Sequence, residues 1–310
     1  MSSDALIQIG SGSGPRPTAP SWQERLESLR LELLRLGSAV VAYSGGVDSS
    51  LLLRVAHEVL GERAFGVIGR SDSYAERELE LALEQAARFG AQVEIVTTGE
   101  LADPRFRSNR SDRCYHCKHE LYRKLEEVAA RRGVVVILDG TIADDLADWR
   151  PGRRAAGERG VRSPLAELGF VKADVRAAAE HFGLSSHDKP ASPCLASRIP
   201  YGTEITRETL KMVEDGEALL RELGFRELRV RHHGDVGRIE VPLAELGRLL
   251  EPGIRERVVE GLKALGYRFV ALDLEGFRSG SLNVGLPEPG PTAAGFQDRE
   301  KREPRPQGRG

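Results

Sequence analysis

The chain has 310 residues, and its 45 Lys and Arg nearly balance its 47 Asp and Glu, which leaves a formal net charge of −2 at pH 7. A chain of this length holds one large or two medium domains. The near-neutral charge gives no general case for binding nucleic acid or a membrane surface. The longest apolar runs, such as residues 134–138, are too short to span a bilayer.

Both ends of the chain have compositions that predict disorder. Residues 1–20 and 285–310 are rich in Gly, Pro and polar or charged residues without apolar periodicity, so they cannot bury enough surface to offset their ordering entropy. The amino terminus also lacks the basic start and apolar centre of a signal peptide. Three cysteines, an odd number, argue against a disulfide framework. We therefore expect a cytoplasmic protein.

Between residues 21 and 200 helical and strand patterns alternate. The predicted helices and strands, in chain order, are a helix at 22–36, a strand at 38–43, a helix at 47–60, a strand at 64–68, a helix at 74–89, a strand at 92–97, a helix at 118–131 and a strand at 134–139. Strands without strict polar alternation, separated by amphipathic helices, predict an α/β domain with a parallel sheet covered on both faces. Ligands of such sheets bind beyond the carboxyl ends of the strands.

Two glycines follow the first predicted strand, in the sequence Ser-Gly-Gly-Val-Asp-Ser. Gly45 and Gly46 allow backbone amides to approach an anion, the following helix points its positive end at it, and Ser44 and Ser49 supply hydroxyls. The loop has no lysine, unlike a G-x-x-x-x-G-K-[ST] loop. We interpret it as a pyrophosphate site. The alternative is an ordinary tight turn, with Asp48 stabilised by the helix dipole.

After residue 200 the pattern changes. A helix is predicted at 207–223 and strands at 227–233, 236–241 and 267–274. Two short helical stretches are predicted before the last strand. They predict a small α+β domain over residues 201–284. The proline-rich segment 184–202 is interpreted as a long functional loop that joins the two domains.

Several polar residues cluster on the first two strands of this small domain. They are Arg229, Arg231, His232, His233 and Glu240. Alternation places Arg229 and Arg231 on one face. They form either a polar outer face with cross-strand pairs or a subunit or substrate surface that closes over the cysteine loop, and the sequence leaves both interpretations open.

The three cysteines lie in two polar contexts. Cys114 and Cys117 form a C-x-x-C just before a predicted helix, and Cys194 lies in Pro-Cys-Leu-Ala-Ser-Arg. Basic neighbours are predicted to lower the pKa of these thiols. These neighbours are Arg113, Lys118, Lys189 and Arg198.

Four interpretations of the cysteines compete. A lone C-x-x-C is typical of a redox pair, although it does not begin a thioredoxin-like unit here. Zinc needs four ligands, which His116 or His119 could complete. A [4Fe–4S] cluster on three thiolates leaves one iron open to an extra sulfide. The fourth interpretation is that of buried, inert cysteines.

The glycine loop resembles the Ser-Gly-Gly-x-Asp-Ser signature of the PP-loop ATP pyrophosphatases, a superfamily with an adenine nucleotide α-hydrolase-like, Rossmann-like domain. Its members cleave ATP to AMP and pyrophosphate, usually by adenylylating a substrate oxygen. Further motifs occur in the order found in the LarE family, over residues 22–283. They are Asp112-Arg-Cys-Tyr-His-Cys-Lys118, Asp139-Gly-Thr-Ile-Ala-Asp-Asp145, Arg150-Pro-Gly152, Arg162-Ser-Pro-Leu165 and Pro193-Cys-Leu-Ala-Ser-Arg198.

The LarE family comprises ATP-dependent sulfur transferases that make the nickel-pincer nucleotide cofactor of lactate racemase. Some members sacrifice the sulfur of the cysteine that matches Cys194 and retain dehydroalanine. Others also have a C-x-x-C, and their three cysteines are thought to hold a [4Fe–4S] cluster. This chain is similar to the second kind, because Cys114 and Cys117 would be superfluous in a purely sacrificial enzyme.

The resemblance implies a role for each matching residue. ATP and pyrophosphate would be bound by Ser44, Gly45, Gly46, Asp48 and Ser49. Mg²⁺ would be held by Asp144 and Asp145, for which helix capping is the alternative. The substrate's phosphate and carboxylates would be bound by arginines, with Arg150, Arg162 and Arg198 as the main candidates and Arg153 and Arg154 beside them. Catalysis would rest on Asp48, Arg198 and Cys194, and the cluster on Cys114, Cys117 and Cys194.

The implied substrate is pyridinium-3,5-biscarboxylic acid mononucleotide. Its carboxylate would attack the α-phosphorus of ATP, and the acyl adenylate would then meet sulfur, which yields a thiocarboxylate; we expect a homo-oligomer. Three alternatives differ in class. An amidating synthetase lacks an ammonia source here, a tRNA thiolase would need a basic face, and a nucleotide-binding iron–sulfur scaffold would not turn ATP over.

Overall fold

A computed structural model describes residues 19–146, 151–190, 192–278 and 282. The predicted tails 1–20 and 285–310 lie outside these residues, except for residues 19 and 20. Arg150 also lies outside them. Among the helices of the described part, none is long and apolar enough to cross a membrane.

A four-stranded parallel sheet forms the centre of the larger part of the molecule, which confirms the predicted α/β class. Its strand order is β3-β2-β1-β4, and Val41 on β1 lies opposite both Gly66 on β2 and Leu138 on β4. The strands are β1 (Ala39–Ala42), β2 (Ala64–Arg70), β3 (Val93–Thr97) and β4 (Ile137–Leu138). The last strand is shorter than the predicted 134–139, because only two of its residues pair in register with β1.

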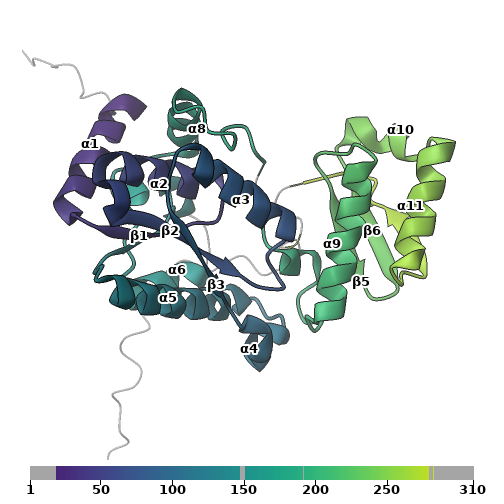
Figure 1. Cartoon of the computed structure of the whole chain (residues 1–310). Helices are drawn as coiled ribbons and strands as arrows, with labels where there is room; N and C mark the ends of the chain where they lie inside the picture. Colours follow the sequence, from purple (N-terminus) through teal and green to yellow (C-terminus); the bar gives the residue numbers. More distant parts are fainter. Residues whose placement is uncertain (1–18, 147–150, 191, 279–281, 283–310) are drawn as a thin grey trace, which may run out of the picture.

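Helices cover both faces of this sheet (Figure 1). One face packs against α1 (Trp22–Leu36), α2 (Val47–Leu60), α3 (Glu76–Arg88) and α8 (Lys172–His181). The other face packs against α5 (Arg113–Arg132) and α6 (Pro151–Glu158). Two short helices, α4 (Pro104–Arg107) and α7 (Pro164–Glu167), precede α5 and α8 in the chain order. The predicted helices at 22–36, 47–60, 74–89 and 118–131 correspond to α1, α2, α3 and α5, and each buries apolar residues against the sheet.

Helix α5 begins at Arg113, five residues earlier than the predicted start at 118. The C-x-x-C therefore lies inside the first helical turn and not before the helix, which corrects the prediction. The residues 113–117 lack an apolar stripe of their own, so periodicity alone placed the helix start too late. Tyr115 N–H still donates to the carbonyl of Asp112, which closes the turn.

The second part of the chain is a smaller α+β unit with a three-stranded sheet. Its elements are α9 (Arg207–Glu222), β5 (Arg229–His233), β6 (Val236–Glu240), α10 (Leu246–Leu249), α11 (Pro252–Ala264) and β7 (Phe269–Leu272). The strand order is β5-β6-β7, with β5 antiparallel and β7 parallel to β6. A separate apolar cluster fills this unit. The boundaries 21–200 and 201–284 stay a prediction.

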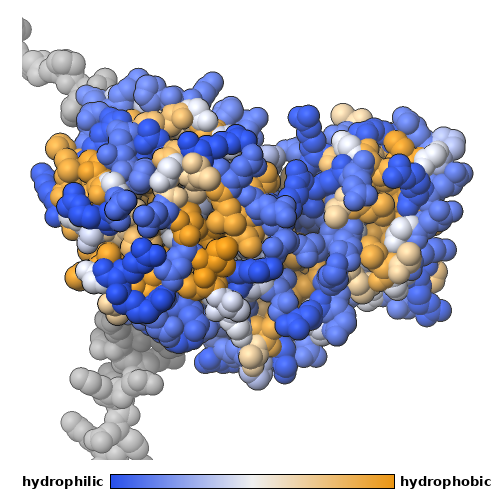
Figure 2. Space-filling view, viewed as in Figure 1, coloured by the Kyte–Doolittle hydropathy of each residue, from blue (hydrophilic) through white to orange (hydrophobic). Residues whose placement is uncertain are grey.

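The two parts meet around the short helix η4 (Leu195–Arg198), which follows Cys194. Apolar side chains from α4, η4 and α9, such as Phe106, Leu195 and Leu210, form one buried cluster there. Charged side chains surround this junction, and Figure 2 shows hydrophilic residues along the line where the two parts meet. The cysteine segment is therefore held by both parts of the chain.

Candidate functional site

The Ser-Gly-Gly loop joins β1 to α2, as its sequence indicates. Gly45 has a φ of 68°, and a Cβ there would lie 2.6 Å from Cβ of Ala82. Both the backbone conformation and the lack of space therefore require glycine at this position. Gly46 is the N-cap of α2. The Ser49 hydroxyl accepts from the Ser44 backbone N–H at 3.2 Å and lies 3.1 Å from the Ser44 hydroxyl. The loop thus presents amides and hydroxyls at the start of a helix, which suits a phosphate group.

The end of β4 lies directly against this loop. A Cβ on Gly140 would approach the backbone nitrogen of Ser49 to 2.7 Å, so the two backbones are in close contact. Asp139 next to it is buried and accepts hydrogen bonds from the hydroxyls of Tyr122 at 3.0 Å and Ser163 at 2.7 Å. The second strand end therefore forms one side of the phosphate loop, at the carboxyl edge of the sheet.

A lysine that the sequence interpretation missed reaches the loop from α8. Nζ of Lys172 lies 2.7 Å from both carboxylate oxygens of Asp48. Burial raises the pKa of Asp48, the contact with Lys172 opposes that shift, and the charge of Asp145 adds to it. Lys172 stands 124 residues from Asp48, so only the fold brings the cation to a loop that lacks one of its own.

The two other acidic candidates both bond to backbone amides. Asp144 Oδ2 accepts from the Lys172 N–H at 2.7 Å, and Asp145 Oδ2 accepts from the Ile142 N–H at 3.1 Å. Asp144 therefore binds the first amide of α8, which is the capping arrangement that the sequence left open. Asp48, Asp144 and Asp145 nevertheless gather beside the phosphate loop, and a role in binding Mg²⁺ stays a prediction.

The thiols of Cys114 and Cys117 do not have the lowered pKa values that their basic neighbours predict. Burial raises the pKa of Cys114, and the nearby Cys194 raises it further, although part of the Cys114 side chain reaches solvent. Burial also raises the pKa of Cys117, with Glu100 adding to the shift. The prediction was wrong for these two residues because desolvation outweighs the charges of the flanking Arg and Lys.

The three cysteines lie in one region without forming a metal site. Cys117 and Cys194 pack against the same apolar cluster at the junction. Among the described residues, which include all three cysteines, no group of three or more His, Cys, Asp and Glu side chains is arranged to hold a metal ion. The zinc candidates contact other groups: His116 lies 3.6 Å from Asp112, and His119 lies 3.1 Å from a nitrogen of Arg159. Soft thiols suit an iron–sulfur cluster chemically, but their present spacing does not.

Arg198, the main candidate for contacting substrate, is 2% exposed, and its guanidinium is engaged within the protein. It forms a two-point ion pair with Glu217 at 2.8 and 3.1 Å, and it donates to the carbonyls of Pro193 and Cys194. Arg198 thus fastens the cysteine segment to α9. In the same way Arg231 binds Glu240 and donates to the carbonyl of Ser197 at 2.8 Å.

The other arginine candidates are also held by neighbouring groups. Arg162 pairs with Glu32 at 2.9 Å and with Glu167. Arg153 donates to the carbonyls of Asp145 and Leu146, both at 3.1 Å. Arg154 lies over the ring of Tyr115 at 4.0 Å. The bidentate groups that the sequence offered for substrate are thus occupied in this arrangement, and Arg150 lies outside the described residues.

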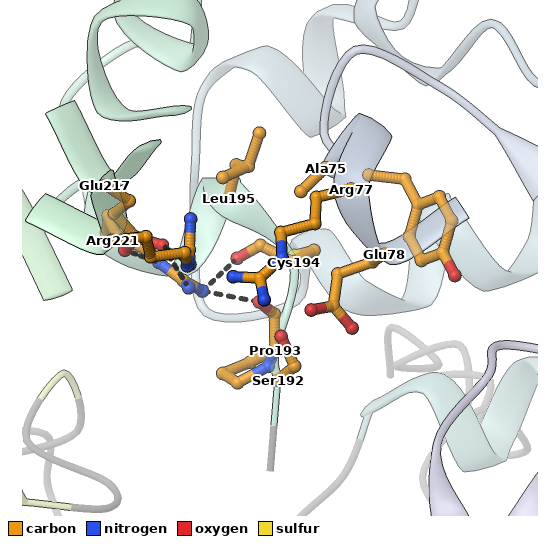
Figure 3. A pocket seen from close by; sticks show the side chains of 11 residues that line it. Ala75, Arg77, Glu78, Ser192, Pro193, Cys194, Leu195, Glu217 and Arg221 are labelled. Carbon is orange, nitrogen blue, oxygen red and sulfur yellow. Dashed lines mark hydrogen bonds and ion pairs between the residues drawn. The ribbon is translucent and has the colours of Figure 1, made fainter. Parts of the chain in front are cut away.

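A pocket lies over Cys194, between the two parts of the chain (Figure 3). Its empty space, with the open solvent at its mouth included, is about 340 Å³, and α3, the cysteine segment and α9 form its walls. The lining residues that the sequence interpretation did not predict are Tyr74, Arg77, Glu78, Glu217 and Arg221. They carry no motif, so only the fold could identify them.

Tyr74 connects this pocket to the phosphate loop. It lines the pocket, and its hydroxyl donates to the carbonyl of Ser44 at 2.9 Å. The adjacent Ser73 accepts, through its carbonyl, the N–H of Leu195 at 2.8 Å. The segment between β2 and α3 thus touches both the phosphate loop and the residue after Cys194. A group activated at the loop would therefore lie near the thiol.

The chain was compared with known proteins, and no family model matches it. An uncharacterised protein of Synechocystis sp. is 44% identical over 261 residues, which are 84% of this chain and 97% of that protein. The pyridinium-3,5-bisthiocarboxylic acid mononucleotide synthase of Lactiplantibacillus plantarum is 42% identical over 252 residues, which are 81% of this chain and 91% of the synthase.

A more distant similarity covers about three fifths of the chain. A glutamine-hydrolysing GMP synthase of Aeropyrum pernix is 29% identical over 208 residues, which are 59% of this chain but only 39% of that protein. This similarity and the parallel sheet agree with the predicted PP-loop fold.

Proposed function

The chain belongs to the LarE family of pyridinium-3,5-bisthiocarboxylic acid mononucleotide synthases, and on that premise we propose that it converts a carboxylate of pyridinium-3,5-biscarboxylic acid mononucleotide into a thiocarboxylate at the expense of ATP. The observation that supports this most is the connection from the Ser44 carbonyl through Tyr74 to the Cys194 pocket. A site for phosphate beside a thiol is what activation followed by sulfur transfer requires, so this connection supports the proposal.

In the first step a carboxylate oxygen of the substrate attacks the α-phosphorus of ATP, and the bond to pyrophosphate breaks. The amides of Gly45 and Gly46 and the hydroxyls of Ser44 and Ser49 stabilise the leaving pyrophosphate. Lys172 supplies a cation that the loop lacks. Mg²⁺, when bound, would neutralise phosphate charge, and Asp144 and Asp145 are the residues that would hold it.

In the second step a sulfur nucleophile attacks the carbonyl carbon of the acyl adenylate, and AMP leaves with the bonding electron pair. In the sacrificial alternative this nucleophile is the thiolate of Cys194. Loss of the Cys194 Cα proton and cleavage of its Cβ–S bond would then release the thiocarboxylate and leave dehydroalanine. A [4Fe–4S] cluster on Cys114, Cys117 and Cys194 remains our prediction for this three-cysteine chain. It would leave the polypeptide mass unchanged, and the cysteines would have to move together to hold it.

The products of ATP test the proposal. The protein is incubated with ATP, Mg²⁺ and the dicarboxylic mononucleotide, and the nucleotides are separated. We expect AMP and pyrophosphate in amounts that depend on the added carboxylate. ADP and phosphate as the main products would refute the assignment, and binding of ATP without turnover would favour a nucleotide-binding scaffold.

The source of sulfur needs a separate measurement. Anaerobically purified protein is analysed for iron and acid-labile sulfide, and its intact mass is recorded after turnover with added sulfide. An unchanged mass with repeated turnover supports the cluster, whereas loss of the elements of hydrogen sulfide at Cys194 supports sacrificial donation. We further propose a cytoplasmic homo-oligomer, whose size gel filtration with light scattering would give.

A further inference from the structure

The arginines that line the Cys194 pocket differ in their contacts. Arg77 lies in the first turn of α3, is exposed, and makes no hydrogen bond or ion pair with the residues that the structure describes. Figure 3 shows its side chain reaching over the cysteine segment from the α3 side. The other arginines that line the pocket are bound to carboxylates, so Arg77 differs from them.

The charges around the pocket do not balance. Its lining holds two carboxylates, and each already has cationic partners. Glu78 pairs with Lys189 at 2.6 Å, and Glu217 pairs with Arg198 at 2.8 Å and with Arg221 at 2.8 Å. The positive charge of Arg77 is therefore in excess. A pocket with an uncompensated guanidinium attracts an anionic ligand.

Arg221 lies on the opposite wall, on α9 of the smaller unit. Its side chain is 23% exposed, lines the pocket and binds Glu217 through one terminal nitrogen. A guanidinium carries five N–H donors in a planar fork that matches carboxylate and phosphate oxygens. Two such groups from different parts of the chain could hold one oxyanion between them.

We propose that Arg77, with Arg221, forms an oxyanion subsite at the mouth of the Cys194 pocket, which holds a substrate oxyanion that does not react. This inference rests on the proposed function, because it takes the substrate to be a dicarboxylic mononucleotide. The oxyanion is the second carboxylate or the phosphomonoester of that substrate. Holding it there orients the activated carboxylate toward Cys194, so Arg77 determines substrate specificity.

The test compares Arg77→Met with wild type, with Arg77→Lys and with the control Arg88→Met. Arg88 lies near the other end of α3, where it pairs with Glu84 on the surface. The dissociation constant of the dicarboxylic mononucleotide is measured by calorimetry without ATP. We expect Arg77→Met to weaken binding by about tenfold, the scale of one charge-assisted contact. Arg77→Lys should recover part of the loss, and Arg88→Met should bind as wild type does.

Two truncated ligands identify the oxyanion. Nicotinic acid mononucleotide lacks the second carboxylate, and the dicarboxylic riboside lacks the phosphate. If Arg77 binds the second carboxylate, the penalty of Arg77→Met should vanish with the first ligand; if it binds the phosphate, the penalty should vanish with the second.

Equal affinity of Arg77→Met and wild type for the full substrate would overturn the subsite, and so would a penalty that persists with both truncated ligands. The proposed function fails in another way, through absence of substrate-dependent pyrophosphate release by wild type. The two failures are therefore distinguishable. Circular dichroism of Arg77→Met checks its fold, which the exposed position of Arg77 should leave intact.

Discussion

Asp48 is held at the phosphate loop by Lys172, at 2.7 Å to both carboxylate oxygens. We expect Asp48→Ala to reduce pyrophosphate release by roughly a hundredfold or more, because the loop loses the carboxylate that holds Lys172 beside the phosphate site. Far-ultraviolet circular dichroism should stay as in wild type, since no apolar packing is removed. Pyrophosphate release at wild-type rates would exclude Asp48 from the site.

Cys194 is expected to act only in the second step. Its thiol lies in the pocket and not on the phosphate loop, so the carboxylate can attack ATP without it. Cys194→Ala should therefore still release pyrophosphate on addition of the substrate but form no thiocarboxylate. Both products are measured in the same reaction, by a pyrophosphate assay and by mass spectrometry. Thiocarboxylate at wild-type levels would remove Cys194 from the mechanism.

At the scale of elements, the site depends on how closely β4 approaches the start of α2. A methyl group on Gly140 would lie 2.7 Å from the nitrogen of Ser49. Gly140→Ala should therefore displace the loop, destabilise the protein by about 1–3 kcal/mol and weaken ATP binding. Gly157→Ala is the matched control, because a Cβ there meets nothing within 4 Å. Thermal unfolding and ATP titration of both variants test this, and equal behaviour of the two would contradict it.

The same elements show what a sequence can predict. The parallel sheet, the helices α1 and α2 and the phosphate loop follow from local periodicity and glycine chemistry, and the structure has them at the predicted places. The start of α5 was misplaced because its first turn carries polar side chains and cysteines instead of an apolar stripe.

The charges at the site were harder to predict. Whether Arg198 is free or buried depends on Glu217, which comes from another unit of the fold. The Lys172–Asp48 contact likewise joins residues far apart in the chain. The pKa values of the thiols depend on burial, which periodicity does not determine for a loop or a helix start. The pocket residues Tyr74 and Arg77 carry no motif, so a sequence pattern cannot identify them.

At the scale of the whole molecule, Glu217 joins the two parts. It is 1% exposed and faces Arg198 from the cysteine segment, Arg221 on α9 and Arg229 on β5, with Tyr267 nearby. Glu217→Gln leaves the buried Arg198 without a countercharge, so we expect a loss of about 3–5 kcal/mol in the free energy of unfolding. Denaturant titration measures it. The control is Glu222→Gln, because Glu222 is exposed. Equal losses of unfolding free energy in both variants would show that Glu217 does not stabilise the junction.

The junction should also respond to acid. Burial raises the pKa of Glu217, but the charges of Arg198, Arg229 and Arg221 and the Arg198 hydrogen bond bring it below the ordinary value of 4.5. Its contribution to stability is therefore present above pH 4.5 and is lost as the pH falls through the lowered pKa. Unfolding of wild type between pH 6 and pH 3, relative to Glu217→Gln, should show this as a difference in the free energy of unfolding that shrinks on acidification.

We propose that this chain places sulfur on a carboxylate that it has first activated with ATP. The most direct measurement is mass spectrometry of the pyridinium mononucleotide after incubation with ATP, Mg²⁺ and the anaerobically prepared protein. We predict a product in which sulfur replaces a carboxylate oxygen, formed together with AMP and absent when ATP is omitted. Release of AMP and pyrophosphate without any sulfur in the nucleotide, or its conversion to an amide when ammonia is supplied, would contradict the account.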